Sequence, residues 1–263
     1  MNVISFPRLG ITLNISSIAF HVGPKPIYWY ALIILTGFLL AIFFVARNSR
    51  KYGVEPDNVM DIAIFGLLFG IIGARIYYVL FSLDEITSFA DVFKIWNGGL
   101  AIYGGIIAAF ITAAVYCRIK KLNVLNVFDV CCPGLFIGQA VGRWGNFVNA
   151  EVFGRETALP WGMSINGAPP VHPLFLYESL WNLLGLVILC LFRNRKTADG
   201  QVVCFYIGWY SLGRLFLEGM RNTTYILYAI PDILGISQLV AAIGVIAAIS
   251  GFVILTKKAK KAG

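Results

Sequence analysis

Residues 142–154, GRWGNFVNAEVFG, place one arginine, two asparagines and one glutamate at the end of an otherwise apolar segment. A charge near hydrocarbon costs roughly 2.5–3.5 kcal/mol on insertion scales, so membrane proteins keep such groups mainly where they bind or react. The planar fork of an arginine binds phosphate and stays charged when partly desolvated. The run therefore predicts a polar functional site built on Arg143, Asn146, Asn149 and Glu151.

Other polar side chains border the apolar segments and gather at one end of them. They are Tyr30, Arg75, Tyr103, His172, Tyr177, Glu178, Arg214 and Glu218. Three arginines among tyrosines and amides would form a pocket suited to a lipid phosphate. For Arg75 a second interpretation stays open, in which an arginine at a helix end merely reaches the membrane interface.

Four polar residues share one face of a predicted helix, because they are spaced by 4, 4 and 3 residues. They are Tyr210, Arg214, Glu218 and Arg221. Such a stripe must face protein or water rather than lipid. Two interpretations are open: Arg214 and Glu218 neutralise each other as a pair inside the helix bundle, or they serve the site. The pair alone leaves Arg75 and Arg143 unexplained.

The elements that position these side chains are predicted to be membrane helices. Hydrophobic residues make up 59% of the 263 residues and charged residues only 13%, a balance that ordinary soluble domains do not show. A helix needs roughly 20 residues to cross the hydrocarbon core. Seven apolar stretches meet that need, at about 27–45, 58–82, 99–117, 125–142, 172–192, 201–219 and 234–256. We therefore predict an all-α integral membrane protein with seven transmembrane helices in a single polytopic domain, residues 1–263, and an outer loop over residues 142–171.

Basic residues indicate the orientation, because Lys and Arg in short loops stay on the cytoplasmic side. They follow the first, third, fifth and seventh stretches, as Arg47, Arg50 and Lys51; Arg118, Lys120 and Lys121; Arg193, Arg195 and Lys196; and Lys257, Lys258, Lys260 and Lys261. The amino terminus is predicted outside and the carboxyl terminus in the cytoplasm. Most of the basic residues behind the net charge of +8 lie in these loops, so we expect a lipid bilayer and not nucleic acid as the partner.

The cysteines and glycines favour helix packing over cofactor chemistry. The five cysteines, at positions 117, 131, 132, 190 and 204, show no C-x-x-C or Cys/His spacing and are interpreted as small apolar residues. No metal or nucleotide motif is present, so no cofactor is predicted. Gly66, Gly70 and Gly73 have spacings typical of close helix approach.

The run at residues 142–154 resembles the signature G-R-x-G-N-F-x-N-x-E-x-x-G of bacterial prolipoprotein diacylglyceryl transferases, with every fixed position filled. The resemblance extends over nearly the whole chain. Its other segments are Tyr28-Trp29-Tyr30, Gly73-Ala74-Arg75, Gly98 to Gly105, His172-Pro173 with Leu176-Tyr177-Glu178, and Tyr210 through Arg214 to Glu218.

The resemblance implies a transferase of the bacterial cytoplasmic (inner) membrane that catalyses the first step of lipoprotein maturation, with its active site toward the outer leaflet. It would move the diacylglyceryl group of phosphatidylglycerol to the thiol of the lipobox cysteine in a preprolipoprotein signal peptide. A thioether would form and glycerol-1-phosphate would leave. Arg143 and Arg214 are expected to stabilise the charge on the leaving phosphate, while Asn146 and Asn149 orient the headgroup or the signature residues. The other substrate-binding residues implied are Glu151, Gly154, Tyr30, Arg75, Tyr177, Glu178, Tyr210 and Glu218.

Tyr103 departs from the family pattern, in which many members have a histidine proposed to take the thiol proton. A thiol has a reference pKa of about 8.5 and a tyrosine of about 10, so tyrosine is a poor proton acceptor at neutral pH. We therefore expect Tyr103 to hydrogen-bond the phosphate while the arginines favour the thiolate. His172 and Glu151 are other candidates for the base, although His172 is equally a cap at a helix start and Glu151 a partner for Arg143.

A transporter for a small anion or an anionic lipid is the alternative function, because it would also need intramembrane arginines. Transporter sites tend to lie near the midplane, in broken helices related by internal repeats. Here the polar residues gather at one end, the number of spans is odd, and no repeat is seen. A receptor or a purely structural membrane protein does not account for residues 142–154. Turnover separates these classes, since only the enzyme consumes phosphatidylglycerol and releases glycerol phosphate.

Overall fold

The computed structural model describes residues 1–85, 88–226, 228–230 and 234–262, and it divides into two compact units. The first unit comprises Met1–Phe44 and Cys132–Gly263, and the second comprises Val45–Cys131. Two of the helices, α1 and α4, run from one unit into the other.

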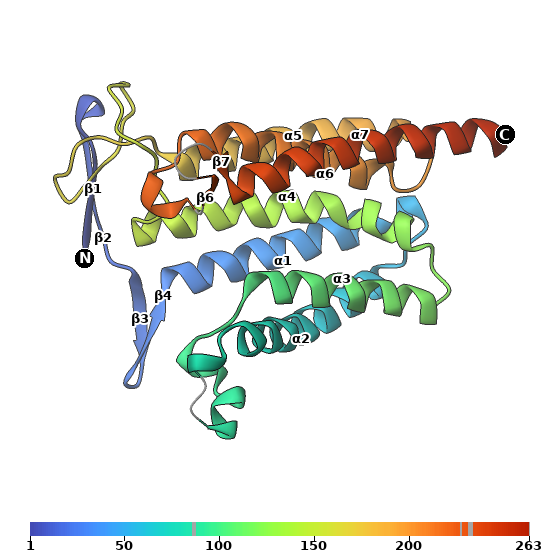
Figure 1. Ribbon diagram of the computed structural model, residues 1–263, viewed down its shortest axis with the longest axis horizontal. Helices are drawn as coiled ribbons and strands as arrows, with labels where there is room; N and C mark the ends of the chain where they lie inside the picture. Colours follow the sequence, from blue (N-terminus) through green and yellow to red (C-terminus); the bar gives the residue numbers. More distant parts are fainter. Residues whose placement is uncertain (86–87, 227, 231–233, 263) are drawn as a thin grey trace. The chain divides into compact units, whose positions relative to one another are not determined.

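The described residues form seven α-helices, whose bounds lie close to the predicted stretches (Figure 1). The helices are α1 (Trp29–Ser49), α2 (Pro56–Phe81), α3 (Ile102–Ile119), α4 (Val124–Asn149), α5 (Leu174–Phe192), α6 (Gln201–Gly219) and α7 (Ile236–Ala262). Short strands join them: β1 (Asn2–Phe6), β2 (Ile11–Ile15), β3 (Ile18–Val22), β4 (Lys25–Tyr28), β5 (Ser164–Ile165), β6 (Tyr228–Ile230) and β7 (Leu234–Gly235). The fold is thus mainly helical, with three small antiparallel sheets that an all-α prediction did not include.

Six of the helices in the described chain are long and apolar enough to span a membrane: α1, α2, α3, α4, α5 and α7. Many of their large apolar side chains are exposed, as Leu35 and Phe43 on α1 and Leu184 on α5 show. Apolar surface of this extent is typical of contact with lipid. The remaining helix, α6, carries Arg214 and Glu218, which lower its mean hydropathy. The prediction of seven spans is therefore borne out for six helices.

The second unit is built on the contact between α2 and α3. A Cβ atom on Gly73 would lie 2.3 Å from Cβ of Ala108 and 2.8 Å from the backbone oxygen of Gly104, so only glycine allows this approach. A Cβ on Gly70 would also contact α3, whereas one on Gly66 would meet nothing within 4 Å. Of the three glycines with spacings typical of close helix approach, Gly70 and Gly73 therefore face α3, and Gly66 does not.

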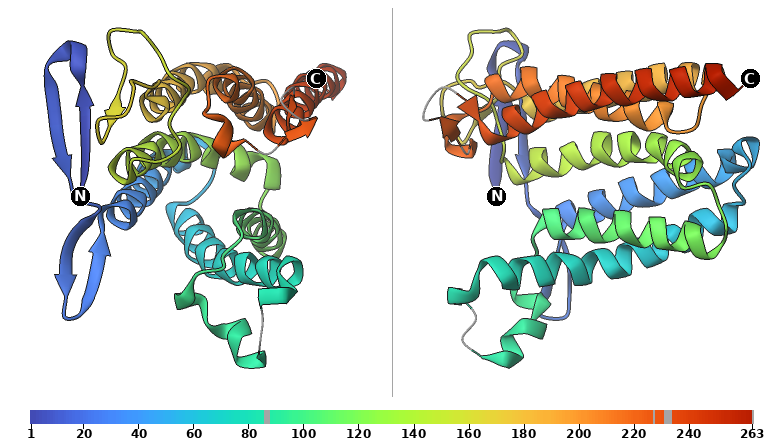
Figure 2. Two further views of the ribbon diagram at one scale, coloured as in Figure 1. Left: turned by 60° about the vertical axis from the view of Figure 1, so that its left-hand side comes forward. Right: turned by 45° about the vertical axis from the view of Figure 1, so that its right-hand side comes forward.

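The first unit places α5, α6 and α7 side by side (Figure 2). The indole rings of Trp181 and Trp209 stack with centroids 4.6 Å apart, and each ring N–H donates to the backbone oxygen of the other residue at 3.0 Å. A Cβ on Gly213 would lie 2.2 Å from Trp181, and one on Gly185 would lie 2.5 Å from Trp209. The two indole rings occupy the space that side chains at Gly213 and Gly185 would need, and this packing fixes the crossing of α5 and α6. These two helices carry much of the site.

A small sheet covers the end of the first unit where α4 ends and α5 begins (Figure 1). Strand β1 lies in its centre, paired with β2 on one side and β5 on the other. Ile4 of β1 is fully buried against Phe147 of α4 and Phe175 of α5. This packing holds the loop that contains β5 against the two helix ends.

The end of α4 corrects the sequence-based prediction. The outer loop was expected over residues 142–171, but residues 142–149 form the last two turns of α4, and the loop begins at Ala150. Glycine is typical of tight turns, but Gly142 and Gly145 lie within the helix. In the structure they admit neighbouring side chains, because a Cβ on Gly145 would lie 2.8 Å from the ring of Tyr30 and one on Gly142 would lie 3.3 Å from Ile34.

Candidate active site

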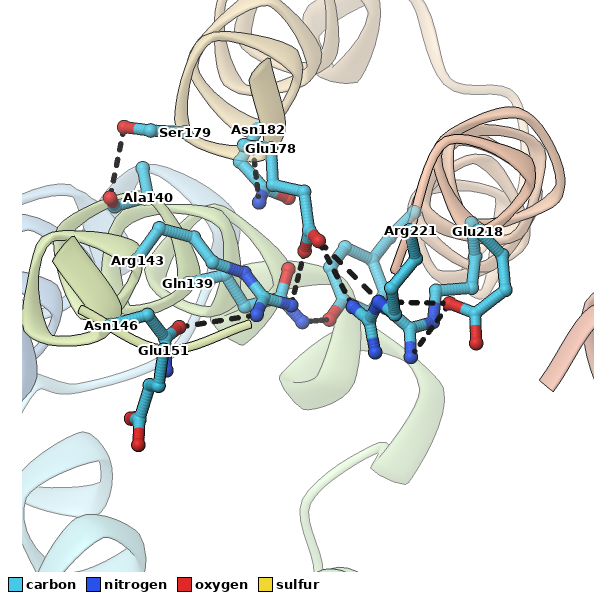
Figure 3. A network of polar contacts seen from close by, with 12 residues as sticks. Gln139, Ala140, Arg143, Asn146, Glu151, Glu178, Ser179, Asn182, Glu218 and Arg221 are labelled. Carbon is cyan, nitrogen blue, oxygen red and sulfur yellow. Dashed lines mark hydrogen bonds and ion pairs between the residues drawn. The ribbon is translucent and has the colours of Figure 1, made fainter. Parts of the chain in front are cut away.

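The candidate site lies in the first unit and is centred on Glu178, in the second turn of α5. The residue is only 6% exposed, and Figure 3 shows Arg143 and Arg221 reaching its carboxylate from two sides. Arg143, in the last turns of α4, contacts Oε2. Arg221, just after α6, donates from Nη2 to Oε1 at 3.1 Å, and Nη1 of Arg214 lies 3.9 Å from the same oxygen. A buried carboxylate requires such partners, since an unpaired buried charge is very costly.

A second carboxylate, Glu218 on α6, shares two of these arginines and is 1% exposed. Its Oε2 lies 3.1 Å from Nη2 of Arg214 and 3.4 Å from Nε of Arg221. Ser237 on α7 donates to Oε1 at 2.5 Å. The i,i+4 pair of Arg214 and Glu218 is thus present. It is not the only contact of Arg214, because the guanidinium also lies near Glu178.

The cluster carries an excess of positive charge. Three arginines and two glutamates give it a formal charge of +1. Arg221 is 7% exposed and holds both carboxylates, so its role is structural. Burial lowers the pKa of Arg221, with Arg214 acting in the same direction and the two glutamates raising it, and the group remains charged. The side chains of Arg143 and Arg214 are 23% and 20% exposed, so the excess charge is open to an anionic ligand.

The amides of the signature run connect Arg143 to Glu151. Nη1 of Arg143 donates to Oδ1 of Asn146 at 3.3 Å, and Nδ2 of Asn146 donates to Oε1 of Glu151 at 3.0 Å (Figure 3). Nδ2 of Asn149 donates to the same oxygen at 3.4 Å. Glu151 therefore supports Arg143 through an amide, which matches the structural role considered for it from the sequence.

The backbone after α4 adopts an uncommon conformation that returns Glu151 toward the helix. Ala150 and Val152, on either side of it, have φ angles of 54° and 55°. A residue other than glycine in this region costs roughly 1–3 kcal/mol, most clearly when it is β-branched as valine is. The hydrogen bonds to Glu151 offset this cost and fix the end of the signature run.

Gly154 closes the loop onto the end of α6. A Cβ there would lie 2.6 Å from Cβ of His172 and 2.8 Å from the backbone oxygen of Met220. The Gly154 N–H donates to the oxygen of His172 at 3.0 Å, and the N–H of Arg155 donates to the oxygen of Met220 at 2.8 Å. The glycine thus has a packing role, and the strand-like contact that it allows positions Arg221.

Tyr177 precedes Glu178 and is held by two ring nitrogens. Nε1 of Trp161 donates to its hydroxyl at 2.6 Å, and Nδ1 of His172 lies 3.4 Å away. Burial lowers the pKa of His172, so its imidazole is neutral at neutral pH. The N-cap position of α5 is Pro173, with no side-chain cap hydrogen bond, so the structure does not support the interpretation of His172 as a helix cap.

Arg75 and Tyr103 belong to the second unit, where Arg75 is occupied by backbone. Its guanidinium donates to the carbonyl oxygens of four residues: Asp91 at 2.5 Å, Val92 at 2.9 Å, and Gly98 and Gly99 at 2.8 Å each. The residue is 9% exposed and lies 5.3 Å over the ring of Tyr78. These contacts give Arg75 a structural role that neither interpretation from the sequence included.

The glycine pair beside Arg75 explains the run that precedes α3. Gly98 and Gly99 have φ angles of 91° and 73°, and a Cβ on Gly99 would lie 2.4 Å from Arg75. Only glycine turns both carbonyl groups toward the guanidinium without strain. Tyr103 then begins α3 with 66% of its surface exposed. Arg75 therefore holds the segment that leads to Tyr103.

Tyr210 and Glu178 line one pocket of the first unit, together with Trp181, Asn182, Gly213, Arg214 and Leu217. The predicted residues that this unit brings together are Arg143, Asn146, Asn149, Glu151, Glu178, Tyr210, Arg214 and Glu218, while Tyr30, Gly154 and Tyr177 pack around them. Among the described residues no group of His, Cys, Asp or Glu is arranged to hold a metal ion.

Two residues of the site were missed from the sequence. Arg221 was placed on the polar stripe of α6 but was not assigned to the site. Asn182 was not considered, although it is a buried amide one turn beyond Glu178. A polar side chain within an apolar helix is itself a signal of function, and this signal was sufficient to identify Asn182 from the sequence.

Comparison with known proteins gives the family of the chain. Residues 17–254 match the family described as prolipoprotein diacylglyceryl transferase. The chain is 42% identical over 246 positions to the phosphatidylglycerol–prolipoprotein diacylglyceryl transferase of Streptococcus equi subsp. zooepidemicus, covering 89% of this chain and 93% of the relative. It is 39% identical over 266 aligned positions to the protein of that name from Lysinibacillus sphaericus, covering 96% of each. For that of Clostridioides difficile the identity is 39% over 244 positions, covering 92% and 96%.

Proposed function

Because the chain belongs to the prolipoprotein diacylglyceryl transferase family, we propose that it moves the diacylglyceryl group of phosphatidylglycerol to the thiol of a lipobox cysteine in a preprolipoprotein. The products are a thioether-linked prolipoprotein and glycerol-1-phosphate. The observation that carries this proposal in the structure is the cluster of formal charge +1 in which Arg143 and Arg214 are partly exposed.

The chemistry needs positive charge at one place. The cysteine sulfur forms a bond to the diacylglycerol carbon that carries the phosphate, and the carbon–oxygen bond breaks. The electron pair of that bond stays on the oxygen of the glycerol phosphate that leaves, and the proton of the thiol passes to solvent water. Arg143 and Arg214 stabilise the negative charge that builds on the leaving phosphate, as preorganised donors do in other enzymes. Asn146, Asn149 and Glu151 hold Arg143 in place.

The substrate-binding roles of the surrounding residues rest on different grounds. Tyr210 lines the pocket beside Arg214, which supports contact with the headgroup. Tyr103, as a hydrogen-bond donor to phosphate, rests on the family resemblance of its segment. A thiol base is not needed in this assignment, because the arginine charges favour the thiolate.

The same proposal includes seven spans in the bacterial cytoplasmic membrane, with the amino terminus outside and the site toward the outer leaflet. The basic loops of the chain support this orientation. Counting α6 as a span is supported by the contacts of its charged residues, which face Glu178 and Ser237 within the protein rather than lipid.

The test is transfer of labelled diacylglycerol from phosphatidylglycerol to a synthetic lipobox peptide by the purified protein in detergent. We expect a thioether-linked peptide and an equal amount of released glycerol phosphate, with activity that persists in chelator. A transporter of anionic lipid would release none. Binding of phosphatidylglycerol by folded protein without turnover would therefore reject the transferase.

A further inference from the structure

The pocket beside the charged cluster contains an amide that the reaction so far leaves unused. Asn182 is 4% exposed and lies on α5, one turn beyond Glu178. Its Nδ2 donates to the backbone oxygen of Glu178 at 2.8 Å. Because that bond needs a donor, it identifies Nδ2 as the atom that faces the backbone oxygen and Oδ1 as the other atom of the amide.

Oδ1 of Asn182 is buried and accepts no hydrogen bond from any residue that the structure describes. Buried side-chain acceptors are nearly always paired, so an unpaired one calls for an explanation. The backbone bond and the packing of Trp181 hold α5 in place without this oxygen. Asn182 and Arg214 both line the pocket, so a ligand bound there is a candidate partner for this oxygen.

The same pocket offers a second unused group, with the opposite hydrogen-bonding character. Nη1 of Arg214 is buried and makes no hydrogen bond within the described part of the chain. It lies 3.9 Å from Glu178, which is close enough for an ion pair but too long for a hydrogen bond. The pocket therefore presents a cationic donor and a neutral acceptor to whatever enters it.

A ligand that satisfies both groups carries an anionic oxygen and, a short distance away, a hydroxyl donor. We propose that Asn182 reads the glycerol headgroup of the lipid substrate, with Oδ1 accepting from a headgroup hydroxyl while Nη1 of Arg214 binds a phosphate oxygen. This inference rests on the proposed function and names what selects the lipid. An ammonium headgroup would also offer a donor, but the net positive charge of the cluster repels it.

The test is a competition between two lipids of equal charge. Vesicles contain phosphatidylglycerol and phosphatidylpropanol, which lacks the headgroup hydroxyls, and the purified protein transfers diacylglycerol from both to a lipobox peptide. With the two lipids at equal concentration, the initial ratio of released glycerol phosphate to propyl phosphate equals the ratio of their kcat/KM values. We expect the wild type to favour phosphatidylglycerol by about tenfold or more, since a buried acceptor left unpaired is costly.

Asn182→Leu should bring that ratio close to one by slowing release of glycerol phosphate more than release of propyl phosphate. Asn182→Thr keeps an acceptor oxygen, one bond closer to the backbone than Oδ1, and should retain at most part of the preference. The matched control is Gln139→Leu, because Oε1 of Gln139 is also buried without a partner among the described residues but does not line this pocket. Gln139 donates to Tyr206 at 2.8 Å, so the control also loses a buried hydrogen bond.

The results distinguish a failure of this inference from a failure of the proposed function. A wild type without preference, or an Asn182→Leu variant with the wild-type ratio, would overturn the inference and leave the transferase intact. Absence of either headgroup product from the wild type would instead remove the proposed function. If Asn182→Leu turns over too slowly to measure, the increase in Tm that each lipid produces replaces the ratio, and equal increases from both lipids in the wild type would contradict the inference.

Discussion

At the scale of single residues, Glu178 is the side chain on which the charged cluster depends. It contacts Arg143, Arg214 and Arg221, and removing one partner of a buried ion pair typically costs about 3–5 kcal/mol. We expect Glu178→Gln to lower the free energy of unfolding by about that amount, because Arg143 would lose its carboxylate partner while Arg214 and Arg221 would share Glu218. Chemical unfolding in detergent, followed by circular dichroism, measures the change.

The matched control for this prediction is Glu55→Gln. Glu55 pairs with Arg50 at 3.1 Å, but the two side chains are 67% and 74% exposed. An exposed pair contributes about 0–1 kcal/mol, so this variant should unfold almost as the wild type does. Equal effects of the two substitutions would show that Glu178 does not hold the cluster together.

The stability of the protein is expected to depend on pH through His172. Burial lowers the pKa of its imidazole from the ordinary value of 6.5, so as pH falls the unfolded chain takes up this proton before the folded chain does. The contribution of neutral His172 to the free energy of unfolding is therefore fully present above about pH 6.5. It is lost as the pH falls from there through the lower pKa that His172 has in the folded state. We expect His172→Gln to lose less Tm than the wild type between about pH 7.5 and about pH 5.5. An unchanged loss would mean that His172 makes no such contribution.

At the scale of elements, the crossing of α2 and α3 depends on particular glycines. Gly73→Ala would force a Cβ to within 2.3 Å of Ala108, so we expect a loss of about 1–3 kcal/mol from overpacking. Gly66→Ala is the control on the same helix, because nothing lies within 4 Å of its Cβ. It should be neutral or stabilise by about 0.5–1 kcal/mol, since alanine favours helix. Thermal unfolding of both variants measures these changes in stability. A Gly73→Ala variant as stable as the wild type would contradict the close contact.

The helices were predictable because their signal is local. Runs of apolar residues long enough to cross a membrane are visible in any window, and each of the seven stretches contains a helix. The end of α4 was not predictable in this way. Gly142 and Gly145 are typical of turns in isolation, and only the neighbouring Ile34 and Tyr30 show that they serve helix packing. The small sheets depend on pairing between β1 and the distant β5, which no local pattern reveals.

The site was predictable in its residue types but less so in its contacts. The spacing of the stripe on α6 placed Arg214 and Glu218 on one face, and the structure confirms their pair. The role of Arg221 depends on the loop that Gly154 closes onto the end of α6. Arg75 meets carbonyl groups that Gly98 and Gly99 turn toward it, and a sequence does not show where a backbone oxygen points.

At the scale of the whole molecule, the proposed orientation is open to chemical labelling. In a variant without the five native cysteines, Lys25→Cys in β4 should react with a membrane-impermeant maleimide in intact spheroplasts, because the amino-terminal segment is proposed to lie outside. Lys258→Cys in the last turns of α7 should react only after permeabilisation. The reverse pattern would overturn the orientation and move the site to the inner leaflet.

The central proposal for the molecule is that the phosphate leaves at the arginine cluster of the first unit. The most direct measurement is kcat for diacylglyceryl transfer by Arg143→Ala and Arg214→Ala, with the exposed Arg50→Ala as control. Glu178 keeps Arg221 in both variants, so their fold should persist, and Tm of each confirms it.

We predict that kcat falls by about 10²–10³ in Arg143→Ala and in Arg214→Ala, the loss expected when one preorganised donor is removed, and that Arg50→Ala keeps the wild-type rate. A folded Arg143→Ala variant with the wild-type kcat would contradict the account, because the leaving phosphate would then be stabilised elsewhere.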